Sequence, residues 1–103
     1  MIIKDLKEGA KISIGETLNL EVGFVPLKKN EKNKLGLHPD EEEAYIILSG
    51  EALLLLGEEE RKVKKGQLVY VPANTLHQFT SLTDDFEYVY AATWPEELKG
   101  RKA

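Results

Sequence analysis

The sequence is divided into short strand-like segments, most of them apolar, each ended by a turn signal, and this pattern constrains the fold most. About nine such segments occur, with Gly, Pro, Asn or Asp separating them every ~8–12 residues. They lie at residues 1–6, 10–14, 18–24, 45–48, 52–56, 61–64, 68–71, 77–82 and 86–93. This pattern predicts an all-β fold, in which a jelly-roll β-barrel protects the strand edges by pairing two sheets.

The segment 18–24 shows the strand pattern most clearly. Its apolar residues alternate with polar or small ones at a period of two, which predicts a strand with one buried face. Pro26 is expected to close this strand. The stretch 28–34 reads KKNEKNK and is expected to be a polar loop with nothing to bury.

Gly50 separates two strongly apolar segments. We expect it to form a tight turn that makes 52–56 the hairpin partner of 45–48. Near the end of the chain, a short helix over 96–99 can follow Pro95, because proline fits the first turn of a helix.

Composition narrows the class of protein. The 103 residues suit one domain, 1–103, and a net charge of −4 argues against a nucleic-acid partner. The chain has no cysteine, so a thiolate metal site is excluded. The longest apolar run, 52–56, is too short to span a bilayer, and the first residues do not resemble a signal peptide. We therefore expect a cytoplasmic protein without a membrane partner, and its Lys and Glu content would suit a thermophile.

Both histidines of the chain stand near predicted strand ends. His38 precedes Glu43 by five residues, and Glu43 opens the apolar segment 45–48. His77 follows the segment 68–71 and a proline turn. Two imidazoles and one carboxylate are the donors of a two-histidine, one-carboxylate metal site, which leaves coordination positions open.

Each of these residues also has a structural interpretation without a metal. Either histidine alone could be a surface or hydrogen-bonded residue. Glu43 lies beside Glu41 and Glu42, which could be a solvated acidic loop. Strand alternation places Glu43 on the same side as Tyr45 and Ile47, where an unpaired carboxylate pointing into the barrel is unfavourable and a metal would remove that cost. Asp40 and Glu42 are weaker substitute ligands.

Two stretches of the chain resemble the two sequence motifs of the cupin superfamily. The first motif is G-x5-H-x-H-x(3,4)-E-x6-G; aligned on Gly50, it identifies Glu43 and His38 as ligand positions. The second is G-x5-P-x-G-x2-H-x3-N, and Gly66, Pro72 and His77 match it at the family spacing.

Four positions depart from the motifs. Gly36 stands where the family has the first histidine of its pair, so one ligand is missing. Asn30 replaces the leading glycine and Ser81 the final asparagine. Asn74 replaces the glycine of the proline turn, and asparagine tolerates the left-handed backbone that such a turn needs.

The resemblance implies a small β-barrel, often dimeric, with a divalent metal near its axis. Its ligands here would be His38, Glu43 and His77, and the metal would be Fe, Mn, Ni, Zn or Cu. Open coordination positions suit Fe(II) oxygenase chemistry, and Zn or Mn with a bound water suits isomerisation or hydrolysis. The alternative is a non-catalytic module that binds or senses a small ligand and has a reduced or vestigial metal site. We also expect a homodimer, because short edge strands such as 1–6 are protected by pairing with a second chain.

Overall fold

A computed structural model describes residues 1–36 and 40–93 of the chain. These residues form eight strands and no helix, so the described part contains no helix that could cross a membrane. The strands are β1 (Lys11–Ile12), β2 (Leu20–Leu27), β3 (Glu42–Ser49), β4 (Glu51–Leu56), β5 (Glu59–Lys64), β6 (Leu68–Val71), β7 (His77–Ser81) and β8 (Phe86–Thr93). The helix expected over 96–99 lies outside the described residues.

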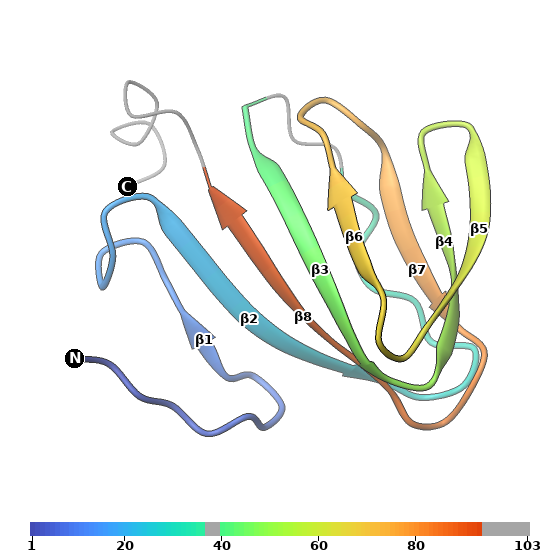
Figure 1. The fold of residues 1–103 in the computed structure, drawn as a ribbon, viewed down its shortest axis with the longest axis horizontal. Helices are drawn as coiled ribbons and strands as arrows, with labels where there is room; N and C mark the ends of the chain where they lie inside the picture. Colours follow the sequence, from blue (N-terminus) through green and yellow to red (C-terminus); the bar gives the residue numbers. More distant parts are fainter. Residues whose placement is uncertain (37–39, 94–103) are drawn as a thin grey trace.

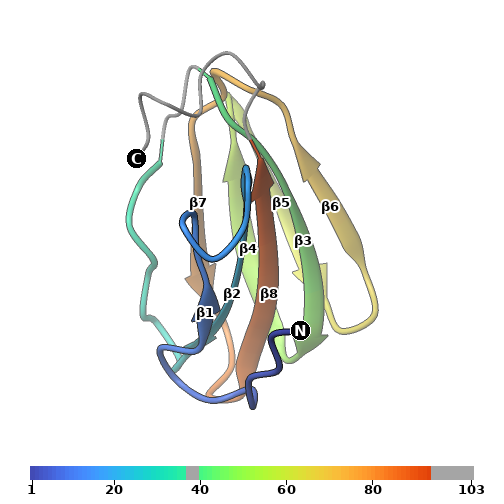
Figure 2. The same ribbon diagram turned by 90° about the vertical axis from the view of Figure 1, so that its left-hand side faces the viewer.

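The strands form two antiparallel sheets (Figure 1). The five-stranded sheet has the order β1-β2-β8-β3-β6, and the three-stranded sheet has the order β5-β4-β7. The last strand, β8, lies between β2 and β3, so distant parts of the chain are neighbours in the sheet. Viewed after a 90° turn, β6 and β7 lie on opposite sides of the molecule (Figure 2). This all-β arrangement confirms the predicted jelly-roll class.

Aromatic rings from both sheets fill the space between them. Phe79 of β7 is fully buried, with an exposed fraction of 0%. Its ring centroid lies 4.6 Å from that of Tyr88, 4.9 Å from that of Tyr45 and 5.2 Å from that of Phe86. Aromatic pairs attract at centroid separations of ~4.5–7 Å, beyond the hydrophobic gain of burial. The Phe79 ring therefore joins the three-stranded sheet to β3 and β8.

The segment 1–6 does not form the expected strand. Lys4 ties it to the body of the protein: its Nζ lies 2.9 Å from a carboxylate oxygen of Glu16 and donates to the carbonyl oxygen of Lys11 at 2.7 Å. Apolar side chains of the segment, such as Ile3 and Leu6, remain largely exposed. The prediction of an edge strand was wrong because the segment is held by side-chain contacts rather than by a backbone ladder.

Strand β2 continues through Pro26 to Leu27 and does not end at the proline. The amide of Phe24 points away from β8 and donates to the carbonyl oxygen of Ala10 at 3.1 Å. The nitrogen of Pro26, two residues further, lies on the same edge of the strand, beyond the end of β1. Proline therefore removes no ladder hydrogen bond here, and such positions are where strands accept it.

The apolar residues that alternate in the first half of β2 do not face the space between the sheets, whereas Val25 and Leu27 further along the strand pack against the core. Gly23 faces inward against the ring of Tyr90, and Glu21 lines an internal cavity. Val22 and Phe24 pair with the outward-facing residues of β8, so they lie on the outer face of the sheet. The alternation of the segment was read correctly, but its apolar side covers the outside of the barrel.

Strands β3 and β4 belong to different sheets and are not a hairpin pair. β3 pairs with β6 and β8, whereas β4 pairs with β5 and β7. Gly50 carries the chain from one sheet to the other with a φ of 74°, and its backbone packs closely against Phe86. The turn was predicted correctly at Gly50, but the strand pairing was wrong.

The polar stretch 28–34 is more than a solvated loop, because the chain from Asn30 to Gly36 runs beside β7. The Asn30 amide donates to the carbonyl oxygen of Ser81 at 2.9 Å. Gly36 and His77 exchange two backbone hydrogen bonds, each of 2.9 Å. The stretch therefore covers the free edge of β7, and it brings Gly36 directly opposite His77.

The corner at Gly50 gives a test of the fold. A Cβ at this position would lie 2.7 Å from the Cα of Phe86, in addition to the unfavourable φ of 74°. We expect Gly50→Ala to lower the free energy of unfolding by about 2 kcal/mol or more, because backbone atoms cannot yield as a side chain can. Urea unfolding followed by circular dichroism measures the change.

Gly66→Ala is the matched control. Gly66 has a similar φ of 89°, but a Cβ there would meet nothing within 4 Å. Only the backbone penalty of roughly 1 kcal/mol should appear in this variant. Equal losses in the two variants would show that the contact with Phe86 does not constrain the corner.

Candidate metal and ligand site

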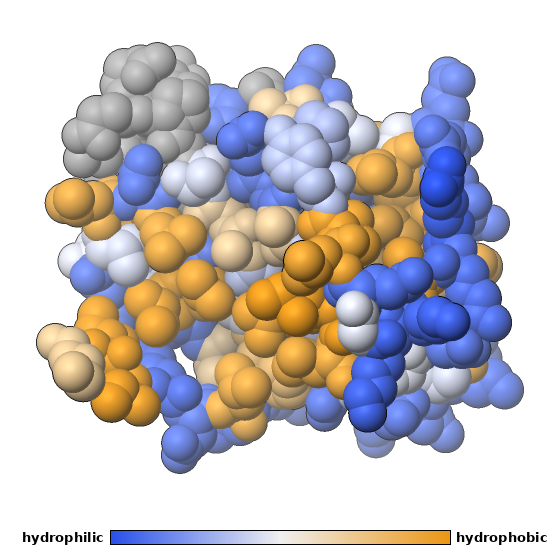
Figure 3. Space-filling model, viewed as in Figure 1, coloured by the Kyte–Doolittle hydropathy of each residue, from blue (hydrophilic) through white to orange (hydrophobic). Residues whose placement is uncertain are grey.

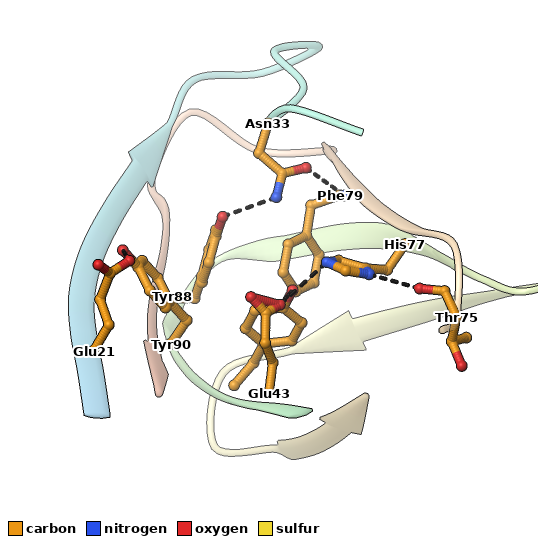
Figure 4. Close-up of polar contacts among 9 residues, drawn as sticks. Glu21, Asn33, Glu43, Thr75, His77, Phe79, Tyr88 and Tyr90 are labelled. Carbon is orange, nitrogen blue, oxygen red and sulfur yellow. Dashed lines mark hydrogen bonds and ion pairs between the residues drawn. The ribbon is translucent and has the colours of Figure 1, made fainter. Parts of the chain in front are cut away.

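His77 begins β7, directly after the proline turn. Asn74 takes a φ of 59° in this turn, which is the left-handed conformation that asparagine tolerates. The His77 side chain is buried, with 5% of the residue exposed. Its Nδ1 lies 2.9 Å from the carbonyl oxygen of Thr75, which places a proton on Nδ1 and turns Nε2 toward the interior (Figure 4).

Glu43 comes from β3 and meets His77 inside the barrel. Its Oε2 lies 3.1 Å from Nε2 of His77 and accepts a 2.9 Å hydrogen bond from the Tyr45 hydroxyl. A further hydrogen bond joins the carboxyl groups of Glu41 and Glu43. Strand alternation correctly placed Glu43 on the inner face with Tyr45.

Burial and pairing act in opposite directions on these two groups. Burial alone would raise the pKa of Glu43, but hydrogen bonds from His77, Glu41 and Tyr45 outweigh it and hold that pKa below the usual value. The hydrogen bond to Glu43 raises the pKa of His77, against the opposing effect of burial, and the Thr75 carbonyl adds to the rise. Without a metal, pairing therefore favours the charged form of each group, the imidazolium of His77 and the carboxylate of Glu43.

The pair opens into a cavity of about 450 Å³. The cavity is lined by Glu21, Lys34, Leu35, Gly36, Glu41, Glu43, Tyr45, His77, Tyr88 and Tyr90. Ionisable groups with perturbed pKa values at a cavity are a common mark of a functional site.

A larger hollow of about 550 Å³ lies between β6 and the β4–β5 hairpin. Aliphatic residues such as Leu54 and Val63 line it, together with the charged residues Glu59, Arg61 and Lys62. Arg61 and Glu59 form an exposed ion pair with each other, and none of the described residues that line the hollow is a histidine. We therefore assign the candidate site to the smaller cavity, where the buried titratable groups lie.

The structure brings two of the three predicted metal ligands together. The third, His38, lies outside the described residues. Within residues 1–36 and 40–93, no three His, Asp or Glu side chains form a cluster able to hold a metal. Of the substitute ligands, Glu42 points to the outer face and accepts a 2.6 Å hydrogen bond from Tyr70, so that suggestion was wrong. Asp40 does not line the cavity.

The donor atoms of Glu43 and His77 fit a metal ion. Carboxylate oxygen and imidazole nitrogen bind divalent metals at ~2.0–2.2 Å, so adjacent ligands of one ion are about 3 Å apart. The observed Oε2–Nε2 separation of 3.1 Å has this size. The hydrogen bond from Nδ1 to Thr75 is the outer contact that typically orients a metal-binding histidine.

Asn33 and Tyr88 were missed by sequence reasoning as members of the site. Asn33 lies in the stretch that was expected to bury nothing, and its Nδ2 donates to the Tyr88 hydroxyl at 3.0 Å. The alternation of residues along β8 places Tyr88 on one face with Phe86 and Tyr90. No sequence signal indicated that Asn33 would reach them across β7.

Together, the fold and the site define a small β-barrel with a polar cavity between its sheets. The profile of the cupin domain family (Cupin_2) matches residues 23–92. The chain belongs to the cupin family.

Two relatives in sequence bear the description uncharacterized protein. SCO3923 of Streptomyces coelicolor is 29% identical over 89 residues, covering 86% of this chain and 84% of that protein. MJ1618 of Methanocaldococcus jannaschii is 33% identical over 78 residues, covering 76% of this chain. This chain spans 56% of the length of MJ1618.

Solved structures agree on the fold. A cupin protein of Bacteroides fragilis, BF4112, superposes with a TM-score of 0.77 at 16% identity, over 90% of this chain and 83% of that one. A sugar phosphate isomerase of the cupin superfamily from Silicibacter pomeroyi has a TM-score of 0.69 at 24% identity, over 79% of this chain and 54% of that one. At these identities the likeness shows the fold alone.

The His77–Glu43 pair gives a pH prediction for the metal-free protein. His77 should titrate above its ordinary value of 6.5 and Glu43 below its ordinary 4.5. The stability from His77 is fully present below pH 6.5 and is lost as pH rises through its raised pKa. The stability from Glu43 is present above pH 4.5 and is lost as pH falls through its lowered pKa. NMR titration of the imidazole signals measures the first shift directly.

Glu43→Gln should return the pKa of His77 toward or below its ordinary value, because burial then acts without a carboxylate partner. Glu42→Gln, on the outer face, should leave it unchanged. A His77→Gln variant assigns the signals of the two histidines. An unchanged His77 titration in Glu43→Gln would show that the pair does not form in solution.

Proposed function

We propose that this cupin binds a divalent transition metal through His77, Glu43 and His38, beside a cavity that takes a small molecule. The contact between Glu43 and His77, buried at the cavity, is the observation that carries the proposal. Its donor set is suited to Fe, Mn, Ni, Zn or Cu. His38 belongs to the set through the family motif.

The chain's own groups have distinct parts in this proposal. The Thr75 carbonyl holds the His77 ring with Nε2 facing inward, and Tyr45 orients the Glu43 carboxylate. A bound divalent ion would polarise a carbonyl or hydroxyl oxygen of the small molecule or activate a water. Isomerisation of a hydroxy-carbonyl compound is the reaction class we favour, since Glu41 supplies a second carboxyl group at the same cavity that could move a proton.

The second candidate is a binding or sensing module without catalysis. Its support is that Glu43 and His77 satisfy each other without a metal, and that Gly36 leaves one family ligand position empty. In that case the cavity would hold a small ligand between the tyrosines while the ion pair serves stability.

Metal uptake separates the two candidates. Incubation with each of the five metals, followed by desalting and elemental analysis, should find about one ion per chain. His77→Ala should abolish uptake, whereas Glu42→Gln should retain it. Binding should also release a proton, because the ion displaces the imidazolium proton of His77. Absence of stoichiometric metal with all five would support the binding module.

Gly36→His provides a gain-of-function variant for the same experiment. Directly opposed residues of an antiparallel pair project to the same face, so an imidazole at position 36 would lie beside that of His77. We expect metal affinity to rise about tenfold or more, which corresponds to ~1.4 kcal/mol. Unchanged affinity in a well-folded variant would show that position 36 does not reach the ion.

We further propose that the protein is a homodimer joined through the outer face of its five-stranded sheet. Two rows of apolar residues cross four strands there without a charge. They are Leu68–Ile46–Val89–Phe24 and Tyr70–Ala44–Ala91–Val22, in register order. We call these eight residues the outer apolar face; Figure 3 looks onto this side of the molecule and shows an orange apolar band across it.

The occupant we favour is a second copy of the same chain. An uncharged face is complementary to itself, so a two-fold contact needs no partner of opposite charge. Leu68 is 79% exposed, Tyr70 57% and Ile46 46%. The molecule measures 37 × 33 Å across its two longer axes, which is wide enough to bury the roughly 800 Å² per partner of a stable interface.

Ile46→Arg should convert the dimer to a monomer, because it places an unpaired charge in the centre of the contact. Light scattering should change from about twice the chain mass of 11.6 kDa to that mass. Leu53→Arg is the matched control: Leu53 lies on β4, where its neighbours Lys62 and Thr80 are polar, so the dimer should persist. A wild-type protein that is monomeric at micromolar concentration would exclude the dimer.

A further inference from the structure

Three tyrosines line the candidate cavity, and the hydroxyl groups of two of them donate hydrogen bonds to glutamate side chains. The Tyr45 hydroxyl donates to Oε2 of Glu43 at 2.9 Å. The Tyr90 hydroxyl donates to Oε2 of Glu21, also at 2.9 Å. A phenol has a single proton to donate, so neither can also donate to a ligand while these bonds persist.

Tyr88 is held differently, because its partner Asn33 is itself oriented by the backbone (Figure 4). The Phe79 amide donates to Oδ1 of Asn33 at 2.7 Å. An amide N–H can only donate, so this contact assigns the oxygen of the Asn33 side chain to Phe79 and its NH₂ group to Tyr88. The Asn33 Nδ2 then donates to the Tyr88 hydroxyl oxygen at 3.0 Å.

The consequence is a hydroxyl that accepts from the protein and keeps its own proton. Among the described residues, Asn33 is the one hydrogen-bond partner of the Tyr88 hydroxyl. Tyr88 is 3% exposed and lines the cavity. Burial raises its pKa to about 12, against a lowering effect of Asn33, so the proton is retained at neutral pH. A buried donor without an acceptor is unfavourable, and a molecule in the cavity would supply one.

We propose that Tyr88, oriented by Asn33, donates a hydrogen bond to an oxygen atom of the small molecule bound in this cavity. The proposal rests on the small-ligand cavity of the proposed function but not on its metal. Tyr88 is then a specificity-determining residue, and a ligand that offers no acceptor oxygen at this point is bound less well.

The remaining groups indicate the class of ligand. Glu21, Glu41 and Glu43 bring three carboxyl groups to the cavity, against the cations Lys34 and His77, and no arginine is among the described lining residues. Carboxylates accept hydrogen bonds and repel anions. The inventory therefore favours an uncharged compound with hydroxyl groups to donate and one carbonyl oxygen to accept, and it disfavours a dicarboxylate.

Dihydroxyacetone, which has one carbonyl and two hydroxyl groups, is the probe for the test, and oxalate is the anionic comparison. Each is titrated into protein carrying a ¹³C label at Cζ of its tyrosines, with and without Zn²⁺. Dihydroxyacetone should move the Tyr88 signal and leave that of Tyr70, which lies on the outer face, in place. Oxalate should bind the metal-free protein more weakly than dihydroxyacetone.

Two variants separate the hydroxyl from the ring. Tyr88→Phe should weaken dihydroxyacetone binding roughly 3- to 10-fold, the effect of one lost hydrogen bond. Asn33→Asp should weaken it similarly although Tyr88 is kept, because the introduced carboxylate accepts the phenol proton and turns it away from the cavity. Tyr70→Phe is the control and should bind as wild type, and thermal melts confirm that each variant is folded.

The outcomes separate this inference from the proposed function. Wild-type affinity in both Tyr88→Phe and Asn33→Asp, or a Tyr88 signal that dihydroxyacetone does not move, would overturn the inference while metal uptake could still succeed. A protein that takes up no metal but shows the Tyr88 response would support the inference and reject the metal site.

Discussion

The contact between the Phe79 ring and the rings of Tyr45 and Tyr88 is the interaction on which the rest of the structure depends. Phe79 comes from the three-stranded sheet and the two tyrosines from the five-stranded sheet, so this contact sets the distance between the sheets. The same two tyrosines carry their hydroxyl groups to the cavity. The same side chains therefore serve packing and chemistry. Their rings pack in the core and close one side of the cavity to water, while the Tyr45 hydroxyl contacts Glu43 and the Tyr88 hydroxyl contacts Asn33.

Local patterns in the sequence predicted those features that depend on residues close together in the chain, namely the strands, the turns and the motif residues. The strand periodicity predicted each strand that the structure contains, together with one at 1–6 that does not form. The motif spacing identified Glu43 and His77, which meet at 3.1 Å. Contacts between distant segments could not be predicted in this way. The inward face of β2 depends on its register with β8, where Gly23 makes room for Tyr90. Asn33 joins the site only because its stretch runs along β7. His38 remains a prediction, because it lies outside the described residues.

The polar groups of the candidate site already form hydrogen bonds with one another, and this affects how the site would bind a metal ion. Glu43 accepts hydrogen bonds from the Tyr45 hydroxyl and from Nε2 of His77. A metal ion bound by both residues would therefore have to displace the proton on Nε2. Metal affinity should therefore be a competition with this buried pair, and a site with fewer protein ligands competes less strongly. Gly36 bears on this competition because it supplies no ligand where the family motif has a histidine. The charges of Glu43 and His77 remain paired with each other in the absence of an ion.

The five-stranded sheet carries apolar residues on both faces, and this has a consequence for how its strands find their pairing. Usually a slip of one residue is prevented because it would send the apolar side of a strand into water. In β3 such a slip would exchange Glu43 and Tyr45 with Ala44 and Ile46, and hydrophobicity alone discriminates weakly between the two arrangements. The correct alignment must then come from shape at the strand ends, where Gly50 admits the backbone of Phe86 and the ladder is irregular between Ile47 and Ser49. A glycine far from the cavity thus contributes to the register that places Glu43 and Tyr45 of β3 in it.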